Sequence, residues 1–595
     1  MNILFCLHGF PPYLCAGAEF MAYEIATYLA QAGHDVNIIS PTHVKKEPVN
    51  PNFDLRGVKV HWDLEKAEWG PLFSAAHVVI THLDNTRSAI TEAKKYNKPV
   101  AHIIHNGGQL HHHSVRPEEA DLVLYNSFHL ANAMKFPAPS FLLYPPVTLA
   151  NYQVPRTPNS DCYSLVNLND NKGGHLFWTL AEQFRGREFL GQKGSYGEQI
   201  MHSSPLPNVT IWENSSDVKR VYARTHVLLM PSKSETWGRV AIEAASNGIP
   251  IIANPATGLR EALGENGAIW VRWDRTYDWI TAIKSLDDRE TYLRYSRAGL
   301  ARAKELEQIS LLQLTALEHA LFAIAHSSRK RVFSLTSETQ YTDHMAPVLH
   351  AMPSENIGFT VVANNGHSDY TATLKHAYLH NLTLFPVPDT IPNFTSMHMC
   401  SGRIAELESS CMLVSSWRDQ QLAVKTRLKD KVVRMEHGAG QSYSDMPNPA
   451  FLGGPGHRGL LAALVPGFPQ LQSLREAEPE LPAYIIGCPK LDFWSMRRSH
   501  AKADSRINVA VSFRYNLGMD ADAIKQQKIA PEQCSAFKSF RLDFENLTLD
   551  LADPTKRTQM ALVGHGHPYA LEALAPWWKG LHVPTCADWD TVLVL

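Results

Sequence analysis

Short apolar runs alternate with amphipathic helical patterns along almost the whole chain. The first run, Asn2–Leu7, is followed by a helical stretch that places Met21, Ile25 and Leu29 on one face. The next apolar run, Val36–Ile39, begins after a turn. Apolar runs of this length between helical stretches are typical of parallel strands that helices cover on both faces. The pattern therefore predicts an α/β protein with parallel sheets.

Breaks in this pattern predict four Rossmann-like domains. Pro145, Pro146 and the polar stretch Pro155–Asp161 separate the first two, and a long helical segment, about 287–325, is expected to close the second. Ser327–Lys330 is the next boundary. The fourth domain is expected to be incomplete, because the chain ends on an apolar run with nothing after it to cover it. The predicted domains are 1–150, 151–328, 329–495 and 496–595.

Composition narrows the class of protein. Of the 595 residues, 44% are apolar and 19% charged, and the net charge of −2 offers no overall basic excess to attract nucleic acid. The eight cysteines form no CxxC pair, so we expect buried free thiols in a reducing compartment. The chain begins without a basic signal segment, and no apolar stretch is expected to span a membrane. These features predict a cytoplasmic protein, with peripheral membrane attachment left open.

Two carboxylates, Glu235 and Glu243, flank the start of a predicted helix. They are separated by seven residues that include Gly238 and Arg239. The first N–H groups of a helix lack internal partners and carry partial positive charge, so they favour a phosphate. One carboxylate can then accept hydrogen bonds from a sugar and the other from a ribose. The segment predicts a nucleotide-sugar site.

The segment around these acids resembles the E-x7-E segment of family 4 glycosyltransferases, which have the GT-B fold of two facing Rossmann-like domains. Further motifs match in order: the loop at Gly17 after Pro11-Pro12, His105 after a strand, and the Lys172-Gly-Gly loop. The resemblance covers about residues 1–328. It implies retaining, metal-independent sugar transfer from a nucleotide donor such as a UDP- or GDP-sugar, with no cofactor.

The resemblance also implies a role for each site residue. Lys172 and the backbone at Gly238 and Arg239 would stabilise the charge of the leaving diphosphate, and Gly17 would let the backbone approach the phosphates. Glu235 would contact the donor sugar, Glu243 the ribose, and His105 would lie near the reacting sugar. The resemblance thus implies two catalytic residues, His105 and Glu235. It also implies five residues that bind the donor: Gly17, Lys172, Gly238, Arg239 and Glu243.

Two features of the first half do not add to the evidence for a nucleotide-sugar site. The family usually has an arginine five positions before the lysine, and here that position is Asn167. The run His111–His113 invites a metal site, but adjacent side chains point in different directions and no second ligand pair is suitably spaced. We therefore expect a solvated loop and no metal ligands.

The second half carries different motifs. His437 follows an apolar run and precedes a glycine, and His567 stands in a Gly-His-Pro sequence. Their order is similar to that in CDP-glycerol glycerophosphotransferase-like enzymes, also of GT-B type. The resemblance implies that His437 is a general base and that His567 contacts donor phosphate. Histidine titrates near neutral pH and suits the first role.

Together the motifs predict a tandem GT-B protein, two pairs of Rossmann-like domains, that transfers a sugar to a glycan, polymer or other acceptor hydroxyl. Three alternatives remain. The second half is a binding scaffold beside a single active site, the protein glycosylates DNA bases, or both halves are decayed transferase folds that serve interaction only. The neutral charge disfavours the DNA-modifying alternative, and the retained pair of acids disfavours the third.

Overall fold

The structure is a computed structural model, and the chain divides into two compact units, Met1–Lys490 and Leu491–Leu595. It describes residues 1–40, 52–62, 64–107, 119–134, 138–155, 161–215, 217–326, 331–353, 356–366, 368–390, 411–423, 431–436 and 460–490, and three strands at 508–514, 559–565 and 591–594. Parallel strands with helices between them dominate the described residues, which confirms the α/β fold class. The four predicted domain boundaries stay a prediction.

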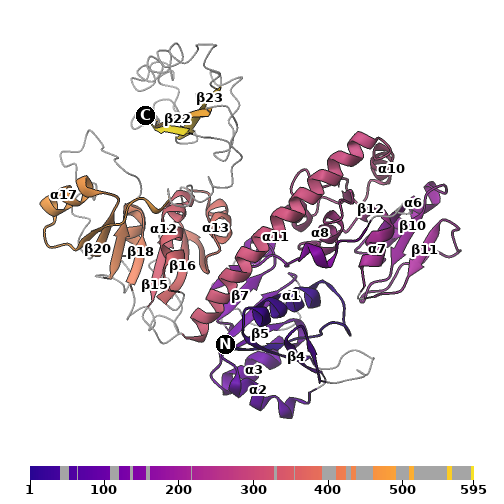
Figure 1. Ribbon diagram of the computed structural model, residues 1–595, viewed down its shortest axis with the longest axis horizontal. Coiled ribbons are helices and arrows are strands. Elements are labelled where there is room, and N and C mark those ends of the chain that lie inside the picture. Colours follow the sequence, from indigo (N-terminus) through magenta and orange to yellow (C-terminus); the bar gives the residue numbers. More distant parts are fainter. Residues whose placement is uncertain are drawn as a thin grey trace. The chain divides into compact units, whose positions relative to one another are not determined.

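The first sheet begins with the first strand of the chain and is parallel except at one edge (Figure 1). Alternate residues of the first strand, β1 (Asn2–Cys6), face two different cores: Ile3 packs toward the helix α1 (Gly17–Gln31), and Leu4 packs toward α2 (Gly70–Ala75) and α3 (Thr86–Lys95). Because both faces are covered, the strands read as continuous apolar runs. Its strands are β1 (Asn2–Cys6), β2 (Asp35–Ser40), β3 (Asn52–Leu55), β4 (Val58–Trp62), β5 (Val78–His82), β6 (Val100–Ile104), β7 (Leu122–Tyr125) and β8 (Ser140–Leu142). Its helices include α1 (Gly17–Gln31), α2 (Gly70–Ala75), α3 (Thr86–Lys95) and α5 (Phe128–Met134).

The second sheet has the order β11-β10-β9-β12-β13-β14 and is parallel throughout. Its strands are β9 (Cys162–Val166), β10 (Phe189–Gln192), β11 (Val209–Trp212), β12 (Thr225–Met230), β13 (Ile251–Ala253) and β14 (Ile269–Trp270). The helices are α6 (Gly174–Gln183), α7 (Lys219–Arg224), α8 (Arg239–Ala245), α9 (Thr257–Leu263) and α10 (Thr276–Ser285). Strands β10 and β14 were not predicted, because each is short and lacks a β-branched run.

A single helix of 37 residues, α11 (Arg289–Ala325), connects the two sheets (Figure 1). It begins at Asp288, whose side chain accepts a hydrogen bond from the Thr291 N–H. The sequence analysis expected this segment to close the second domain, and the structure adds that Leu317 and Leu321 near its end are buried in the core of the first sheet. Among the described helices, it is the one long and apolar enough, by length and composition, to cross a membrane, which the sequence analysis did not expect.

The third group of strands follows α11 and is again parallel, in the order β21-β20-β19-β18-β15-β16-β17. Its last strand pairs antiparallel with β8 through Leu384 and Ser140, and the two groups form one sheet of 15 described strands. The strands are β15 (Val332–Thr336), β16 (Ile357–Asn364), β17 (Leu384–Thr390), β18 (Cys411–Val414), β19 (Val432–Met435), β20 (Leu460–Val465) and β21 (Ala483–Ile485). The helices are α12 (Thr339–Ala351), α13 (Tyr370–Leu379), α16 (Trp417–Ala423) and α17 (Phe468–Ala477).

The second compact unit contains a parallel sheet of three described strands, in the order β23-β22-β24. They are β22 (Asn508–Arg514), β23 (Gln559–His565) and β24 (Thr591–Val594). The first two were predicted from their apolar runs. The third lies in the apolar stretch that the sequence analysis expected to be uncovered, and it pairs with β22.

Burial along α11 predicts where this helix matters for stability. We expect Leu317→Ala to lower the free energy of unfolding by about 2–5 kcal/mol, because a buried side chain is replaced by a cavity. Leu312 lies on the same helix and is 62% exposed, so Leu312→Ala should change the free energy of unfolding by less than about 0.5 kcal/mol. Urea unfolding followed by circular dichroism measures both, and equal effects would contradict this packing.

Candidate functional site

A cavity of about 940 Å³ lies where the first and second sheets present the carboxyl ends of their strands. Seven predicted site residues line it, from both sheets. Two more, His437 and His567, lie outside the described residues. The seven are Gly17, His105, Lys172, Glu235, Gly238, Arg239 and Glu243. They come from four segments of the chain, and neighbouring segments are 63 or more residues apart.

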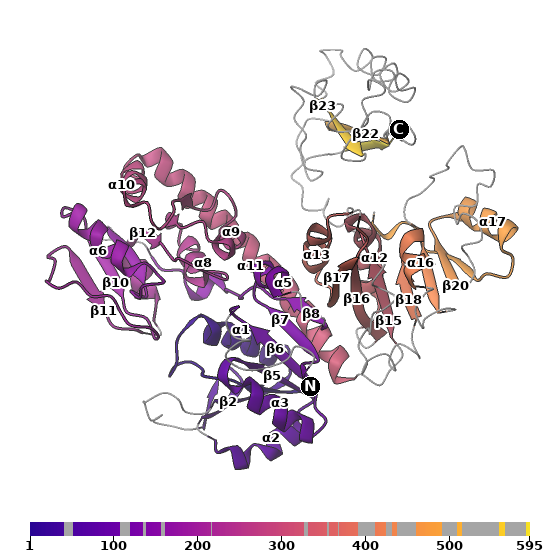
Figure 2. The same cartoon turned by 180° about the vertical axis from the view of Figure 1, so that it is seen from behind.

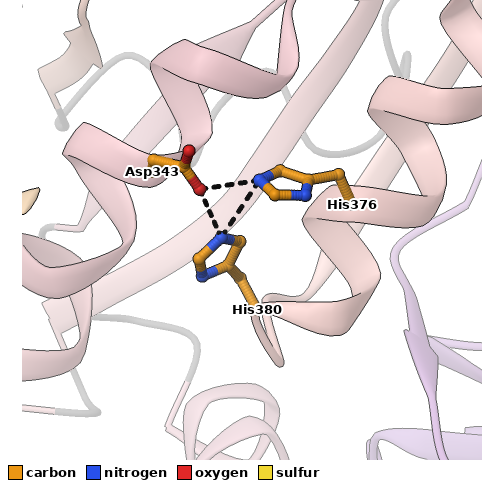
Figure 3. Close-up of side chains that lie close together, drawn as sticks. All are labelled: Asp343, His376 and His380. Carbon is orange, nitrogen blue, oxygen red and sulfur yellow. Dashed lines mark hydrogen bonds and ion pairs between the residues drawn. The ribbon is translucent and has the colours of Figure 1, made fainter. Parts of the chain in front are cut away.

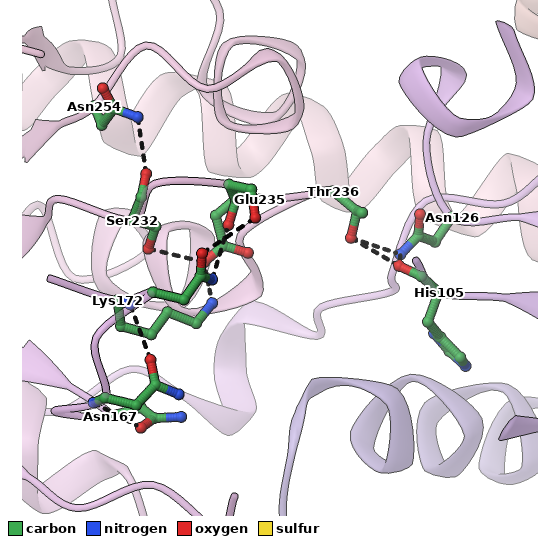
Figure 4. A network of polar contacts seen from close by, with 11 residues as sticks. His105, Asn126, Asn167, Lys172, Ser232, Glu235, Thr236 and Asn254 are labelled. Carbon is green, nitrogen blue, oxygen red and sulfur yellow. Dashed lines mark hydrogen bonds and ion pairs between the residues drawn. The ribbon is translucent and has the colours of Figure 1, made fainter. Parts of the chain in front are cut away.

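Lys172 and Glu235 form a partly buried ion pair on the wall of this cavity (Figure 4). The Glu235 carboxylate also accepts a hydrogen bond from Ser232 Oγ at 3.1 Å. Burial is the largest single effect on the pKa of Lys172 and lowers it, but the Glu235 carboxylate and Tyr196 together raise it by more, so the pKa lies above its ordinary value. Lys172 is therefore a cation whose charge is neutralised by Glu235 within the protein. An anionic ligand can replace Glu235 as the partner of this cation where the Glu235 carboxylate gains hydrogen-bond donors in exchange.

The loop before α6 holds Lys172 in place. The Lys172 backbone N–H donates to Asn169 Oδ1 at 2.9 Å, an arrangement that short polar side chains stabilise in turns. Gly173 follows with a φ of 84°, a left-handed conformation that glycine adopts without strain. The loop geometry thus depends on the residues next to the lysine in sequence.

Asn167 occupies the position where an arginine was expected. Its φ is 68°, and its Oδ1 accepts hydrogen bonds from the Asn169 N–H at 3.3 Å and from Gln199 Nε2 at 3.0 Å. The Asn167 side chain therefore stabilises the loop that carries Lys172. Among the described residues that line the cavity, the lysine and arginine side chains are those of Lys172 and Arg239.

Glu243 is buried at the far end of the acidic segment. Its Oε2 accepts a hydrogen bond from Tyr222 Oη at 2.6 Å, and its Oε1 accepts one from Arg239 Nε at 2.8 Å. Burial raises the pKa of Glu243, which Arg239 and Tyr222 partly offset. A carboxylate has about four lone-pair positions, so both oxygens retain capacity for a ligand hydroxyl.

Arg239 has protein partners at each end of its guanidinium group. Nη1 donates to the Pro146 carbonyl and Nη2 to Tyr152 Oη, both at 2.6 Å, and Nη2 lies 3.5 Å from Glu24 Oε1. The side chain thus joins α8 to the linker and to α1. Phosphate binding by this guanidinium group stays a prediction, and it requires exchange of one of these partners.

His105 is buried between the two sheets. Its Nε2 lies 3.0 Å from His82 Nδ1, and its carbonyl accepts hydrogen bonds from Thr236 Oγ1 at 2.8 Å and Asn126 Nδ2 at 3.1 Å (Figure 4). Burial, with a contribution from His102, lowers the pKa of His105 to about 3. The imidazole is therefore neutral near pH 7 and can act through hydrogen bonds rather than through charge.

Glu19 is a cavity residue to which the sequence analysis assigned no role, although it belongs to the loop that begins at Gly17. It is 2% exposed, and its Oε2 has no hydrogen-bond partner among the described residues. Burial raises the pKa of Glu19 to about 7, although backbone hydrogen bonds act in the opposite direction. The sequence offered a weak signal, because Glu19 is an acid two residues after Gly17. Its burial in the structure was needed to identify it as a candidate site residue.

Part of the second sheet and its helices matches a known protein family. Residues 188–288 match the family described as "Glycosyl transferases group 1", and this segment contains Glu235 and Glu243. The D-inositol 3-phosphate glycosyltransferase of Rhodococcus erythropolis is 33% identical over 125 residues, 21% of this chain and 26% of that protein. Sulfoquinovosyl transferase SQD2 of Arabidopsis thaliana is 36% identical over 81 residues, 13% of this chain and 16% of that protein. The chain thus matches about a quarter or less of the length of these relatives.

Solved structures also resemble part of the chain. Sucrose-phosphate synthase from Thermosynechococcus elongatus has a TM-score of 0.44 and 16% identity, covering 54% of this chain and 100% of that one. Anabaena HepE in complex with UDP-glucose has a TM-score of 0.41 and 16% identity, covering 53% of this chain and 100% of that one.

The backbone of the acidic loop predicts a sensitive position in α9. A Cβ atom at Gly258 would overlap the Glu235 carbonyl and the Thr236 backbone, so we expect Gly258→Ala to displace this loop and cost about 1–3 kcal/mol of stability. At Gly299 in α11 the nearest atom to an added Cβ is 3.5 Å away. Gly299→Ala should therefore be neutral or stabilising by up to about 1 kcal/mol. Thermal unfolding compares the two, and a harmless Gly258→Ala would contradict the close approach.

Proposed function

We propose that residues 1–328 form a glycosyltransferase that moves a sugar from a nucleotide-diphosphate donor to an acceptor hydroxyl. The observation that carries this proposal is the single cavity in which Lys172, Glu235 and Glu243 face Gly17 and His105. The family match over residues 188–288 supports it, since the match includes both acids.

The diphosphate of the donor would bind at Lys172 and at the backbone beside Gly238. As the bond to the sugar breaks, negative charge develops on the leaving phosphate, and a positioned cation stabilises it. Lys172 exchanges its partner, from Glu235 to phosphate, and Glu235 becomes available to accept hydrogen bonds from donor sugar hydroxyls. Each charge then keeps a partner in the cavity.

The other residues orient the substrates. Glu243 would accept hydrogen bonds from the ribose through the lone pairs that Tyr222 and Arg239 leave open. His105, neutral and buried, would hydrogen-bond the reacting sugar without adding charge. We further propose that transfer proceeds with retention and needs no metal ion, because protein groups neutralise the diphosphate.

A panel of UDP-, GDP- and ADP-sugars tests the proposal by donor hydrolysis and by thermal stabilisation of the full chain. One donor should stabilise the protein and be hydrolysed, and Lys172→Met and Glu235→Ala should each lower the rate at least roughly 100-fold. Lys233 is the matched control: it lies outside the cavity and pairs with exposed Asp170 at 2.8 Å. Lys233→Met should keep the rate within about twofold.

Two results would contradict the proposal. No stabilisation or hydrolysis with any donor would argue against the transferase function itself. Proton NMR of the first product reports the anomeric configuration, and an inverted product would exclude the retaining mechanism while leaving transfer intact.

For residues 329–595 we propose a second, glycosyl- or glycerophosphotransferase-like module. In sequence, His437 follows the end of β19 at Met435 and His567 follows the end of β23 at His565, each by two residues. The carboxyl ends of parallel strands are where α/β folds carry ligand sites, which supports these two histidines. If His437→Ala and His567→Ala leave all products unchanged, the second half is a scaffold and the chain has one active site.

A further inference from the structure

We propose that Asp343, His376 and His380 bind one divalent cation of the zinc class between α12 and α13 (Figure 3). None of the three lines the donor cavity. The sequence analysis expected no metal ligand and did not consider these residues. The site is thus independent of the proposed transferase function.

The helices bring the three side chains together. His376 and His380 are four residues apart at the end of α13, so they lie on the same face, one turn apart. Asp343 lies in α12, which packs beside α13 against β15–β17 (Figures 1 and 2). The spacing of the two histidines was a sequence signal, but the carboxylate that completes the set comes from another helix.

The donor atoms converge on one point. His376 Nε2 and His380 Nε2 lie 2.7 and 2.9 Å from Asp343 Oδ1 and 3.3 Å from each other. Ligand atoms around a tetrahedral zinc ion, at bond lengths of about 2.0–2.1 Å, are roughly 3.3 Å apart. The two imidazoles already have this separation, and the carboxylate oxygen needs to retreat by about half an ångström.

The chemistry of the set selects the ion. Two imidazoles and one carboxylate favour zinc, cobalt or nickel over calcium or magnesium, which prefer oxygen ligands. The side chains of Asp343 and His376 are 28% and 34% exposed, so water can reach the fourth coordination position. Binding needs only that each neutral imidazole carry its proton on Nδ1, which frees the Nε2 lone pair.

Neighbouring groups hold the ligands without occupying the site. His350 Nε2 donates to the His380 carbonyl at 2.7 Å, which restrains the end of α13. Lys490 Nζ lies 3.6 Å from Asp343 Oδ2, the carboxylate oxygen turned away from the histidines. The competing explanation is a network in which both imidazole N–H groups donate to Asp343 Oδ1 and no metal binds.

Adding zinc chloride to the chelator-treated full chain tests whether these residues bind a metal ion or only hydrogen-bond to one another. After gel filtration, wild type should retain one more zinc per chain than His376→Ala/His380→Ala, measured by elemental analysis. Asp343→Asn, nearly the same shape, should weaken zinc binding at least roughly tenfold by calorimetry. His202→Ala is the matched control, because His202 pairs with Glu182 at 3.1 Å without a second imidazole in that pair, and it should retain zinc like wild type.

Equal zinc content and affinity in wild type and both cluster variants would overturn the proposal. Should the double alanine variant misfold by circular dichroism, the visible spectrum of the cobalt-loaded protein replaces it. That spectrum should show coordinated cobalt in wild type and lose it in Asp343→Asn, and an unchanged spectrum would equally overturn the site.

Discussion

The buried guanidinium group of Arg239 is the interaction on which the first half of the structure depends. Removing a charge from water is costly unless it is fully paired, and breaking a buried pair costs about 3–5 kcal/mol. Arg239 meets this requirement with Glu243 from its own helix, the Pro146 carbonyl, Tyr152 and Glu24. These partners lie on α8, on α1 and in the segment 146–152 between the two domains, so satisfying one charge fixes how α8 lies against α1.

The geometry of the cavity depends on this pairing of Arg239. With α8 in place, the loop before it places Glu235 on Lys172 and Thr236 on the His105 carbonyl. The side chains of Lys172, Glu235 and Glu243 are thus paired before a ligand arrives, and a ligand can exchange partners with them. Preorganised groups of this kind stabilise developing charge without reorganising during the reaction.

Pairing of two strand edges joins the first group of strands to the third. Strands β8 and β17 meet through Leu384 and Ser140, and Ser140 Oγ also lies 2.7 Å from Tyr378 Oη in α13. An exposed strand edge is a liability, and this contact covers one edge of each group. It also anchors α13, which carries His376 and is followed directly by His380 of the proposed metal site.

Sequence alone determined the α/β class, most of the described strands, the long helix α11, and the residue types of the proposed donor site. It succeeded because strand periodicity, loop glycines and the spacing of Glu235 and Glu243 are local properties of the chain. Tertiary structure alone decided the partners: the neutrality of His105, the pairing of Lys172 and the gathering of Asp343 with two histidines. Burial and charge pairing join residues far apart in sequence, so no local pattern records them.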